Sequence, residues 1–399
     1  MSRKPIFAPA RLFPGVQRRR SLIALYAAAV FLFWAALYLY VPTLPLVARS
    51  RTDDLAFVGV ILAQYGLWQA LVRLPVGIMS DWSGRRKPFI IVGFGLAALG
   101  AWLMGSSADA GGLLVGRAIT GLAAATWVPL VVVFNRMFPP QDAVRATALL
   151  TFVASASRMV ATGANGWLNG LGGYSLAFLL AATAACIALL VVLPAHEEAL
   201  APRRPAPRGV LAIVARRDVW LPSALAGVSL YAAWATTFGF FPLLARQLGA
   251  DDVTQSLLTS LNVAAGTIGN LLAATAVLRI GSKRLALLSF VLLAGSTALA
   301  VPATSLAPLY MAQALGGLAS GVAAPVLMGL SIQKVAEAER ATAMGAHQAI
   351  YAIGMFGGPW LSGILASAIG LQAMFAVTAA GTLMLGVLGV RLMERRQDG

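Results

Sequence analysis

Long apolar runs separated by short polar clusters occupy almost the whole chain. A helix needs about 20 apolar residues to cross a bilayer, and these runs reach that length without the alternation of barrel strands. We therefore predict an all-α integral membrane protein with twelve transmembrane helices, at residues 22–47, 55–79, 88–107, 112–134, 147–170, 174–194, 220–245, 254–279, 285–303, 307–332, 342–366 and 371–392.

Composition agrees with this pattern, because 59% of the residues are hydrophobic and 11% are charged. A soluble domain carries about 25% charged residues. The first apolar run is too long for the core of a signal peptide, so we expect it to be a retained helix.

The net charge of +16 reflects topology rather than nucleic-acid binding. If the N-terminus is cytoplasmic, the inner segments hold 24 of the 30 Lys and Arg, and the outer segments hold only Arg49, Arg51 and Arg246. This asymmetry predicts a multi-pass protein of the plasma (inner) membrane with both termini in the cytoplasm.

The two halves of the chain resemble each other. "PLVAR" (45–49) recurs as "PLLAR" (242–246), and "GLAAATWVP" (121–129) recurs as "GLASGVAAP" (317–325), at nearly the same offset. Parallel repeats of this kind are an architecture of secondary transporters. The predicted organisation is a tail (1–21), a six-helix bundle (22–194), a cytoplasmic linker (195–219), a second bundle (220–392) and a tail (393–399).

The stretch "GIMSDWSGRR" (77–86) follows the second predicted helix, with Gly77, Asp81, Gly84, Arg85 and Arg86 at characteristic spacing. It resembles motif A of the major facilitator superfamily, although Trp82 replaces a base of the motif. "GRAITGLAAA" (116–125), which contains Arg117, resembles motif B of the drug-efflux or metabolite-exporter-like members with twelve helices. The resemblance implies rocker-switch alternating access, with Asp81 latching the halves in the outward-facing state.

A glycine-proline pattern typical of antiporters is broken in the fifth helix and reappears in the eleventh, at Gly354, Gly358 and Pro359. Small residues at this spacing also let membrane helices pack closely. Both interpretations, a sliding helix contact and an antiport signature, stay open.

Three arginines lie inside the predicted spans, and no Asp or Glu lies deeper than Asp81. We expect Arg73, near a helix end, to extend its charge to the membrane surface. Arg117 and Arg158 are deeper, and an unpaired buried charge is strongly unfavourable. This imbalance motivates the hypothesis that the central cavity binds anionic, partly apolar substrates.

Proton coupling has no obvious carrier. His347 normally titrates near neutral pH but also fits a structural role, and Arg117 with water or Asp81 are alternatives. We expect no cofactor, with the proton-motive force as the candidate energy source; facilitated diffusion and exchange stay open.

Polar and aromatic residues on the helices that enclose the family's cavity are the candidate substrate ligands. They are Trp34, Tyr38, Gln64, Arg117, Trp127, Arg158, Asn165, Tyr231, Trp234, Asn262, Gln313, His347 and Tyr351.

The function predicted is secondary transport of a small organic solute, as an exporter of amphipathic or anionic compounds. The alternatives are a facilitative uniporter or exchanger, an uptake permease for an organic anion, a lipid flippase, a channel and a membrane-embedded enzyme. Enzyme function is disfavoured, because "HExxH", "GxxxxGK[ST]" and buried His, Asp or Glu clusters are missing from the sequence. The expected partners are the solute and the lipid bilayer, with no nucleic acid and no metal, and the protein is expected to be a monomer.

Overall fold

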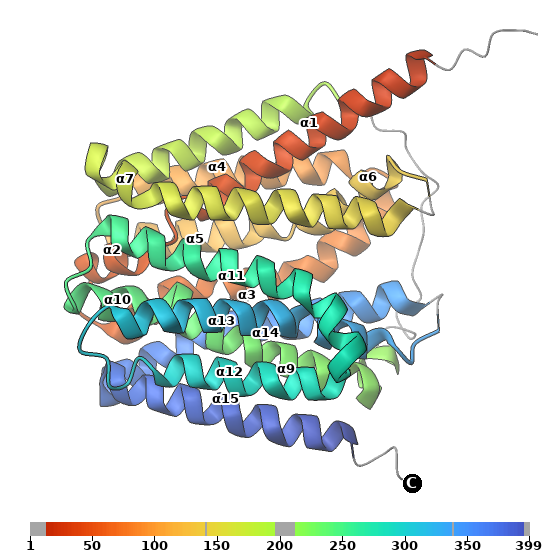
Figure 1. Ribbon diagram of the computed structural model, residues 1–399. Helices are drawn as coiled ribbons and strands as arrows, with labels where there is room; N and C mark the ends of the chain where they lie inside the picture. Colours follow the sequence, from red (N-terminus) through yellow and green to blue (C-terminus); the bar gives the residue numbers. More distant parts are fainter. Residues whose placement is uncertain (1–12, 140–141, 196–211, 337–338, 395–399) are drawn as a thin grey trace, which may run out of the picture.

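The computed structural model describes residues 13–139, 142–195, 212–336 and 339–394, and these residues form helices and short connections (Figure 1). Most of the predicted linker and much of both tails, at 1–12, 196–211 and 395–399, lie outside the described residues. The helices are α1 (Phe13–Tyr38), α2 (Leu44–Arg51), α3 (Leu55–Ser83), α4 (Lys87–Ser106), α5 (Ala110–Ala124), α6 (Trp127–Arg136), α7 (Ala143–Val192), α9 (Arg217–Ala235), the π-helix η2 (Thr236–Phe240), α10 (Phe241–Gln247), α11 (Asp252–Ile280), α12 (Ser282–Ala298), α13 (Ala307–Ile332), α14 (Arg340–Ile369) and α15 (Leu371–Glu394).

These helices supply the twelve predicted crossings. Ten stretches are long and apolar enough to cross a membrane, and one of them, Arg145–Val192, has 48 residues. That length suffices for two crossings, and the backbone leaves helical geometry at Gly172 and Gly173. Helix α12, with 17 residues, is the equivalent in the second repeat of α4 in the first repeat. It makes the remaining crossing.

Several predicted spans are broken where the sequence suggested one helix. The first span ends at Tyr38 and resumes as α2, and the seventh passes from α9 through η2 into α10. Pro45 and Pro242 each stand in the first turn of the resumed helix. Proline lacks a backbone N–H and fits that position better than a helix interior. Hydropathy does not reveal such breaks, because the broken segments remain apolar.

The two halves lie side by side, with α1, α4 and α7 in the upper part of Figure 1 and α9, α12 and α15 in the lower part. They meet where α3 packs on α14 and where α7 packs on α11. A Cβ added to Gly66 would lie 2.4 Å from the backbone nitrogen of Phe356, and one added to Gly166 would lie 2.0 Å from the carbonyl oxygen of Asp252. The halves are therefore in backbone contact at positions where only glycine fits.

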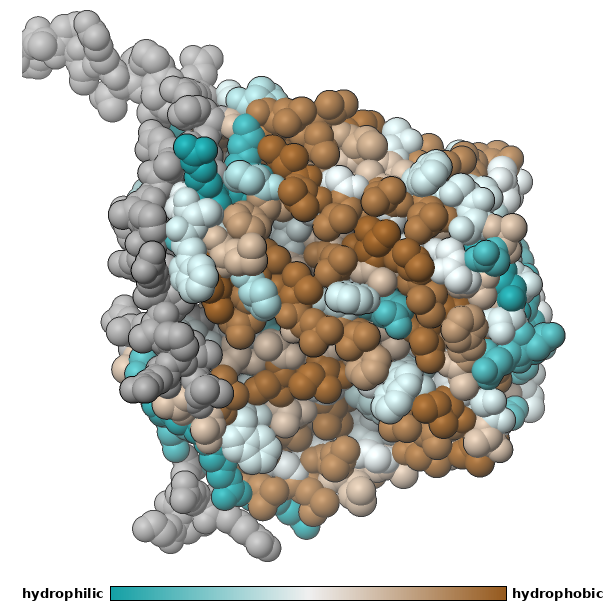
Figure 2. Space-filling view, turned by 180° about the vertical axis from the view of Figure 1, so that it is seen from behind, coloured by the Kyte–Doolittle hydropathy of each residue, from teal (hydrophilic) through white to brown (hydrophobic). Residues whose placement is uncertain are grey.

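The bundle has two distinct ends. We call the end where α1 begins and α15 stops the terminal side, on the right of Figure 1, and the opposite end the far side. Between them the exposed surface is apolar: Figure 2 shows hydrophobic residues across the middle and hydrophilic ones gathered toward the ends. Residues such as Leu271, which is 69% exposed, would be stable in this position only against lipid.

The contact at Gly166 makes a testable prediction. Gly166→Val should push α7 away from α11, because overpacking of a close contact costs about 1–3 kcal/mol. We expect a lower thermal midpoint and at least a tenfold loss of transport in proteoliposomes. Gly170→Val is the control, since nothing lies within 4 Å of the added Cβ; equal damage by both variants would contradict the close-contact explanation.

Candidate functional site

A chain of aromatic rings crosses the boundary between the halves. The centroid distances are 5.4 Å for Trp127–Trp34, 5.7 Å for Trp34–Tyr38, 6.1 Å for Tyr38–Phe238, 5.1 Å for Phe238–Trp234 and 5.3 Å for Trp234–Tyr65. We call these six residues the aromatic row. It runs from α6 and α1 to η2 and α9 in the second half and back to α3. The row brings together four of the predicted cavity residues: Trp34, Tyr38, Trp127 and Trp234.

Two guanidinium groups lie over rings of the aromatic row. Arg158 on α7 lies 5.0 Å from the Trp34 ring and 5.7 Å from the Tyr38 ring. Arg117 on α5 lies 4.2 Å from the Tyr65 ring. Aromatic faces carry partial negative charge and stabilise a cation placed over them. The rings therefore supply part of the counter-charge that the sequence does not provide as carboxylates.

The two arginines differ in their remaining contacts. Arg158 is half-buried and donates to the Ala154 carbonyl (3.3 Å) and the Ser155 hydroxyl (3.1 Å) on its own helix. Arg117 is 2% exposed, and its Nε and Nη1 find no acceptor in the described part of the chain. The indole N–H of Trp34, also buried, likewise has no acceptor among the described residues. Both groups are buried donors that no acceptor of the described residues satisfies.

The prediction that Arg73 extends to the membrane surface is wrong. Arg73 is 6% exposed, and its Nη1 donates to the Tyr351 hydroxyl across the halves at 2.9 Å. Burial follows from helix periodicity, because Tyr65, Gln69 and Arg73 are spaced by four residues and share the inward face of α3. That spacing could have identified Arg73 in the sequence.

His347 and Tyr351 lie with Arg73 toward the terminal side and do not belong to the aromatic row. The His347 Nδ1 lies 3.0 Å from the Ser223 hydroxyl, and its ring meets the Tyr351 ring edge-on at 5.6 Å. His347 is 2% exposed. These contacts fit the structural role considered for His347.

Polar side chains join the halves on the far side. Asn169 Nδ2 donates to Asp252 (3.0 Å) and to Thr43 (3.1 Å), and Thr43 donates to Asn165 (2.9 Å). Asp252 also pairs with Arg246. We call these five residues the far-side network; it includes the predicted residue Asn165, away from the aromatic row.

Further hydrogen bonds between the halves lie nearby on α7 and α11. The Gly166 N–H donates to the Ser256 hydroxyl (2.6 Å), and the hydroxyls of Thr162 and Ser260 lie 2.8 Å apart. The Thr162–Ser260, Gly166–Ser256 and Asn169–Asp252 hydrogen bonds lie in the half of the bundle nearer the far side, whereas Arg73–Tyr351 lies toward the terminal side. The structure is thus closed on the far side.

The remaining predicted cavity residues are placed elsewhere. Asn262 donates to the backbone carbonyl of Gln313 at 3.1 Å, inside the second half. Gln64 is half-buried and accepts from Trp68 on its own helix. Tyr231 packs against α14, where its carbonyl oxygen would lie 2.7 Å from a Cβ added to Gly358.

Comparison with known sequences assigns this architecture to a family. The sequence pattern of the Major Facilitator Superfamily matches residues 26–230 and, a second time, residues 223–399. The chain belongs to the Major Facilitator Superfamily. The double match agrees with the two repeats, and membership identifies the protein as a transporter rather than an enzyme.

Solved superfamily structures share the fold. A bacterial homologue of the human lysosomal transporter Spinster, in an inward-facing and occupied conformation, superposes with a TM-score of 0.80 at 15% identity, covering 94% of this chain and 97% of that one. The nucleoside transporter NupG gives 0.72 at 17% identity, covering 94% and 100%. The human organic anion transporter TETRAN gives 0.68 at 17% identity, covering 93% and 99%.

A curated relative matches over a short region. The inner membrane transport protein YajR of Escherichia coli is 38% identical over 69 residues, which is 17% of this chain and 15% of the relative. The match therefore spans only a small part of that relative's length.

The superfamily loop at the end of α3 has the geometry of a tight turn. Gly84 adopts a φ of 64°, in the left-handed region, and its N–H donates to the Asp81 carbonyl. The Asp81 carboxylate pairs with Arg86, while Arg85 is exposed. A Cβ added to Gly77 would meet Val128 at 3.5 Å, an ordinary contact, so Gly77 does not mark a close helix approach here.

The small residues of α14 do mark close approaches. A Cβ added to Gly354 would lie 2.0 Å from the Gly227 carbonyl oxygen on α9. The Pro359 carbonyl oxygen lies 2.4 Å from the Cβ position of Gly59 on α3. The helix therefore touches both halves, as the sliding-contact interpretation requires.

The cation–π contact at Arg117 predicts a matched pair of variants. Tyr65→Leu should lower stability by about 2 kcal/mol, because a desolvated cation–π contact of that size is lost. Tyr65→Phe keeps the aromatic face and should leave the thermal midpoint within about a degree of the parent. Thermal unfolding of the purified protein measures both, and equal midpoints for Leu and Phe would show that the ring face does not hold the charge.

Proposed function

We propose that the protein is a secondary transporter that exports a small organic anion with an apolar body by rocker-switch alternating access. The solute site is the aromatic row with Arg158 and Arg117. The setting we propose is the plasma (inner) membrane, with both termini cytoplasmic and a single chain as the working unit.

The single observation that carries this proposal is the buried positive charge without an acid. Every Asp and Glu of the described residues lies at a helix end or in a connection, whereas Arg117 and Arg158 lie inside the spans. Buried charges require a partner. The rings compensate part of the positive charge, and a carboxylate or phosphate on the solute would compensate the rest. The same group would accept a hydrogen bond from the indole N–H of Trp34.

The aromatic row supports an apolar body on the same solute. Its rings present flat, polarisable faces on both sides of the boundary between the halves, which we call the seam. Offset or edge-on packing against such faces favours planar groups. A fully polar anion would gain little from packing against these rings. Organic anions with a hydrophobic part therefore fit better than small inorganic anions.

The transport cycle follows from the two ends of the bundle. With cytoplasmic termini, a structure closed on the far side has its outer gate shut. Opening that gate requires breaking the Asn169–Asp252 bond and separating α7 from α11, while α3 and α14 approach on the terminal side. Asp81 would then latch the outward-facing state, as the family resemblance implies.

Exchange or facilitated diffusion of an organic anion is the second candidate function. It is favoured by the same observation, since a proton carrier inside the described spans would be expected to be a carboxylate. The likeness in fold to the organic anion transporter TETRAN is compatible with either direction. An uptake permease or a lipid flippase would use the same fold with a different solute.

The first test of the solute site is Arg158→Gln. Loss of a hydrogen-bonded charge costs about 1.5–3 kcal/mol, so affinity for an organic anion should fall at least tenfold. A panel of organic anions, cations and neutral compounds screened by thermal shift identifies the ligand, and titration of that ligand gives the affinity. Arg145→Gln, an exposed position on the same helix, is the control; unchanged affinity in Arg158→Gln would exclude the site.

Transport in proteoliposomes decides the mode of energy coupling. Uptake is measured with and without an imposed pH gradient and with solute preloaded inside. Acceleration by the gradient supports proton coupling, whereas acceleration only by preloaded solute supports exchange. Flux that does not saturate would identify a channel.

A further prediction concerns the loop at Asp81. Asp81→Asn should slow transport several-fold while leaving solute affinity unchanged, because the residue acts on the conformational equilibrium. Asp53→Asn, an exposed change on the far side, should behave like the parent. Loss of affinity in Asp81→Asn would instead mean that the loop only supports the fold.

A further inference from the structure

The contacts α3–α14 and α7–α11 are equivalent by the internal repeat, which has an offset of 197 residues between the segments that begin at 45 and 242. At this offset Gly59 on α3 corresponds to Ser256 on α11, and Gly363 on α14 corresponds to Gly166 on α7. A Cβ added to Gly59 would lie 2.9 Å from the Gly363 Cα, and the Gly166 N–H donates to the Ser256 hydroxyl at 2.6 Å. Both sides of the seam therefore have the same close contact near the far side.

Toward the terminal side this equivalence ends. Arg73 on α3 is 6% exposed and donates to the Tyr351 hydroxyl on α14. The counterpart of Arg73 is Asn270 on α11, which is exposed. The counterpart of Tyr351 is Ala154 on α7, whose methyl group cannot accept a hydrogen bond. The side-chain bond that joins α3 to α14 at this depth thus has no equivalent between α7 and α11.

The surfaces of α7 and α11 that meet near the far side become exposed toward the terminal side. On α11, Ser256, Thr267 and Leu278 share one face, because successive members are separated by about three helical turns. Ser256 is buried, Thr267 is half-buried and Leu278 is 86% exposed. On the matching face of α7, Gly166 is buried and Phe152 is 60% exposed. The two helices therefore diverge and leave an opening between them on the terminal side.

The walls of this opening are apolar. Phe152 stands on α7, and Leu271 and Leu278 stand on α11; the counterpart of Phe152 on α14 is Ala349, which is half-buried. The most apolar part of α11 is 17% buried, against 39% or more in the other long apolar stretches of the described chain. Exposed apolar walls of this extent are stable against lipid chains rather than against water. The opening therefore faces the hydrocarbon of the membrane.

A positive charge and an amide lie at the inner end of the opening. Arg158 donates back along α7 to the Ala154 carbonyl and the Ser155 hydroxyl, one turn toward the terminal side. Because Ala154 and Asn270 are the counterparts of a pair that bonds across the seam, the Arg158 guanidinium lies at about the depth of Asn270. A polar group exposed at this depth is unfavourable unless a partner reaches it. An anionic group between the two helices would accept hydrogen bonds from both side chains.

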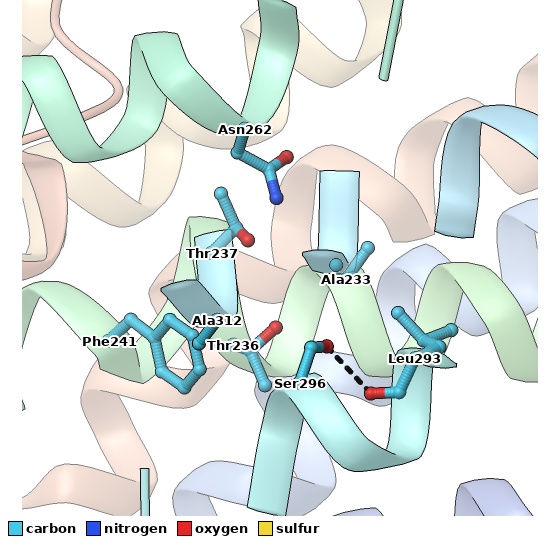
Figure 3. A pocket seen from close by; sticks show the side chains of 9 residues that line it. Ala233, Thr236, Thr237, Phe241, Asn262, Leu293, Ser296 and Ala312 are labelled. Atoms are coloured by element: carbon cyan, nitrogen blue, oxygen red, sulfur yellow. Dashed lines mark hydrogen bonds between the residues drawn. The ribbon is translucent and has the colours of Figure 1, made fainter. Parts of the chain in front are cut away.

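A separate small pocket inside the second half offers no competing site for an anion (Figure 3). Its polar side chains bond within that half: Ser296 donates to the Leu293 carbonyl at 2.8 Å, as drawn in Figure 3, and Asn262 donates to the Gln313 carbonyl at 3.1 Å. The described residues that line this pocket include no Lys or Arg. An anion would find no charged partner there.

We propose that the opening between α7 and α11 is a lateral portal through which an amphipathic anion enters from the membrane leaflet on the terminal side. Its apolar chain lies between Phe152 and Leu278, and its anionic group passes Asn270 to reach Arg158. This inference rests on the proposed anion site and adds the source and class of the solute. The solute is an anion with a chain long enough to partition into lipid, and it reaches the site from the bilayer rather than from water.

The test is photo-labelling of the full chain in phosphatidylcholine nanodiscs with two lipid-soluble probes. One is hexadecyl sulfate with a diazirine in its chain, and the other is the uncharged hexadecanol with the same diazirine. Labelled peptides are identified by mass spectrometry. Because a charge-assisted hydrogen bond holds only the sulfate, we expect it to label residues 145–156 and 267–278 about tenfold more than the alcohol does.

A matched pair of variants on α11 locates the path. Ala274 is exposed on the face that lines the opening, so Ala274→Trp should fill the opening and lower sulfate labelling to the level of the alcohol. Leu272 is 49% exposed on the opposite face of the same helix, so Leu272→Trp should keep the labelling of the parent. Arg158→Gln should remove the preference for the sulfate and leave labelling by the alcohol unchanged.

Three results would overturn the portal: equal labelling of the parent by both probes, a preference for the sulfate that survives Ala274→Trp, or loss of that preference in Leu272→Trp. The comparison of the two probes on the parent decides the question if a variant fails to fold. Failure of the portal is distinguishable from failure of the proposed function. If water-soluble anions raise the thermal midpoint of the parent but the sulfate probe shows no preference, only the portal is refuted; if neither kind of anion binds, the solute site itself is refuted.

Discussion

Positive charge buried without an acid is the constraint on which this structure depends. Arg73, Arg117 and Arg158 lie between helices surrounded by apolar surface, where an isolated charge is strongly unfavourable. The partners that compensate these charges are aromatic faces and a tyrosine hydroxyl rather than carboxylates. Two of these partners, Trp234 and Tyr351, come from the opposite half. For Arg73 and Arg117, compensation of the charge therefore also joins the halves, whereas Arg158 is compensated within the first half.

Close backbone contact makes this arrangement possible. Rings and guanidinium groups can reach across the seam only if the helices that carry them lie near each other. Gly66 on α3 and Gly166 on α7 provide that proximity at two separate places along the interface. The far-side network then adds hydrogen bonds and an ion pair at one end of the seam, and these polar bonds strengthen the contact between the halves at that end.

Hydropathy and the internal repeat predict the twelve helices, and the resemblance of residues 77–86 and 116–125 to superfamily motifs predicts the family. Side-chain placement was harder, because it depends on helix rotation and on breaks that leave apolar content unchanged. Trp34 and Tyr231 occupy equivalent places in the repeat, yet Trp34 joins the aromatic row and Tyr231 packs on α14.

The unequal division of chemistry between the halves has a consequence for any molecule held between them. The first half contributes all three intramembrane arginines, whereas the second half contributes rings and hydroxyls to the seam, and Asp252 at its far-side end. A solute at the seam would experience a steep electric field from one bundle to the other. Its charged end would be drawn to the first half and its neutral end to the second, so that it would travel with one fixed orientation across the membrane.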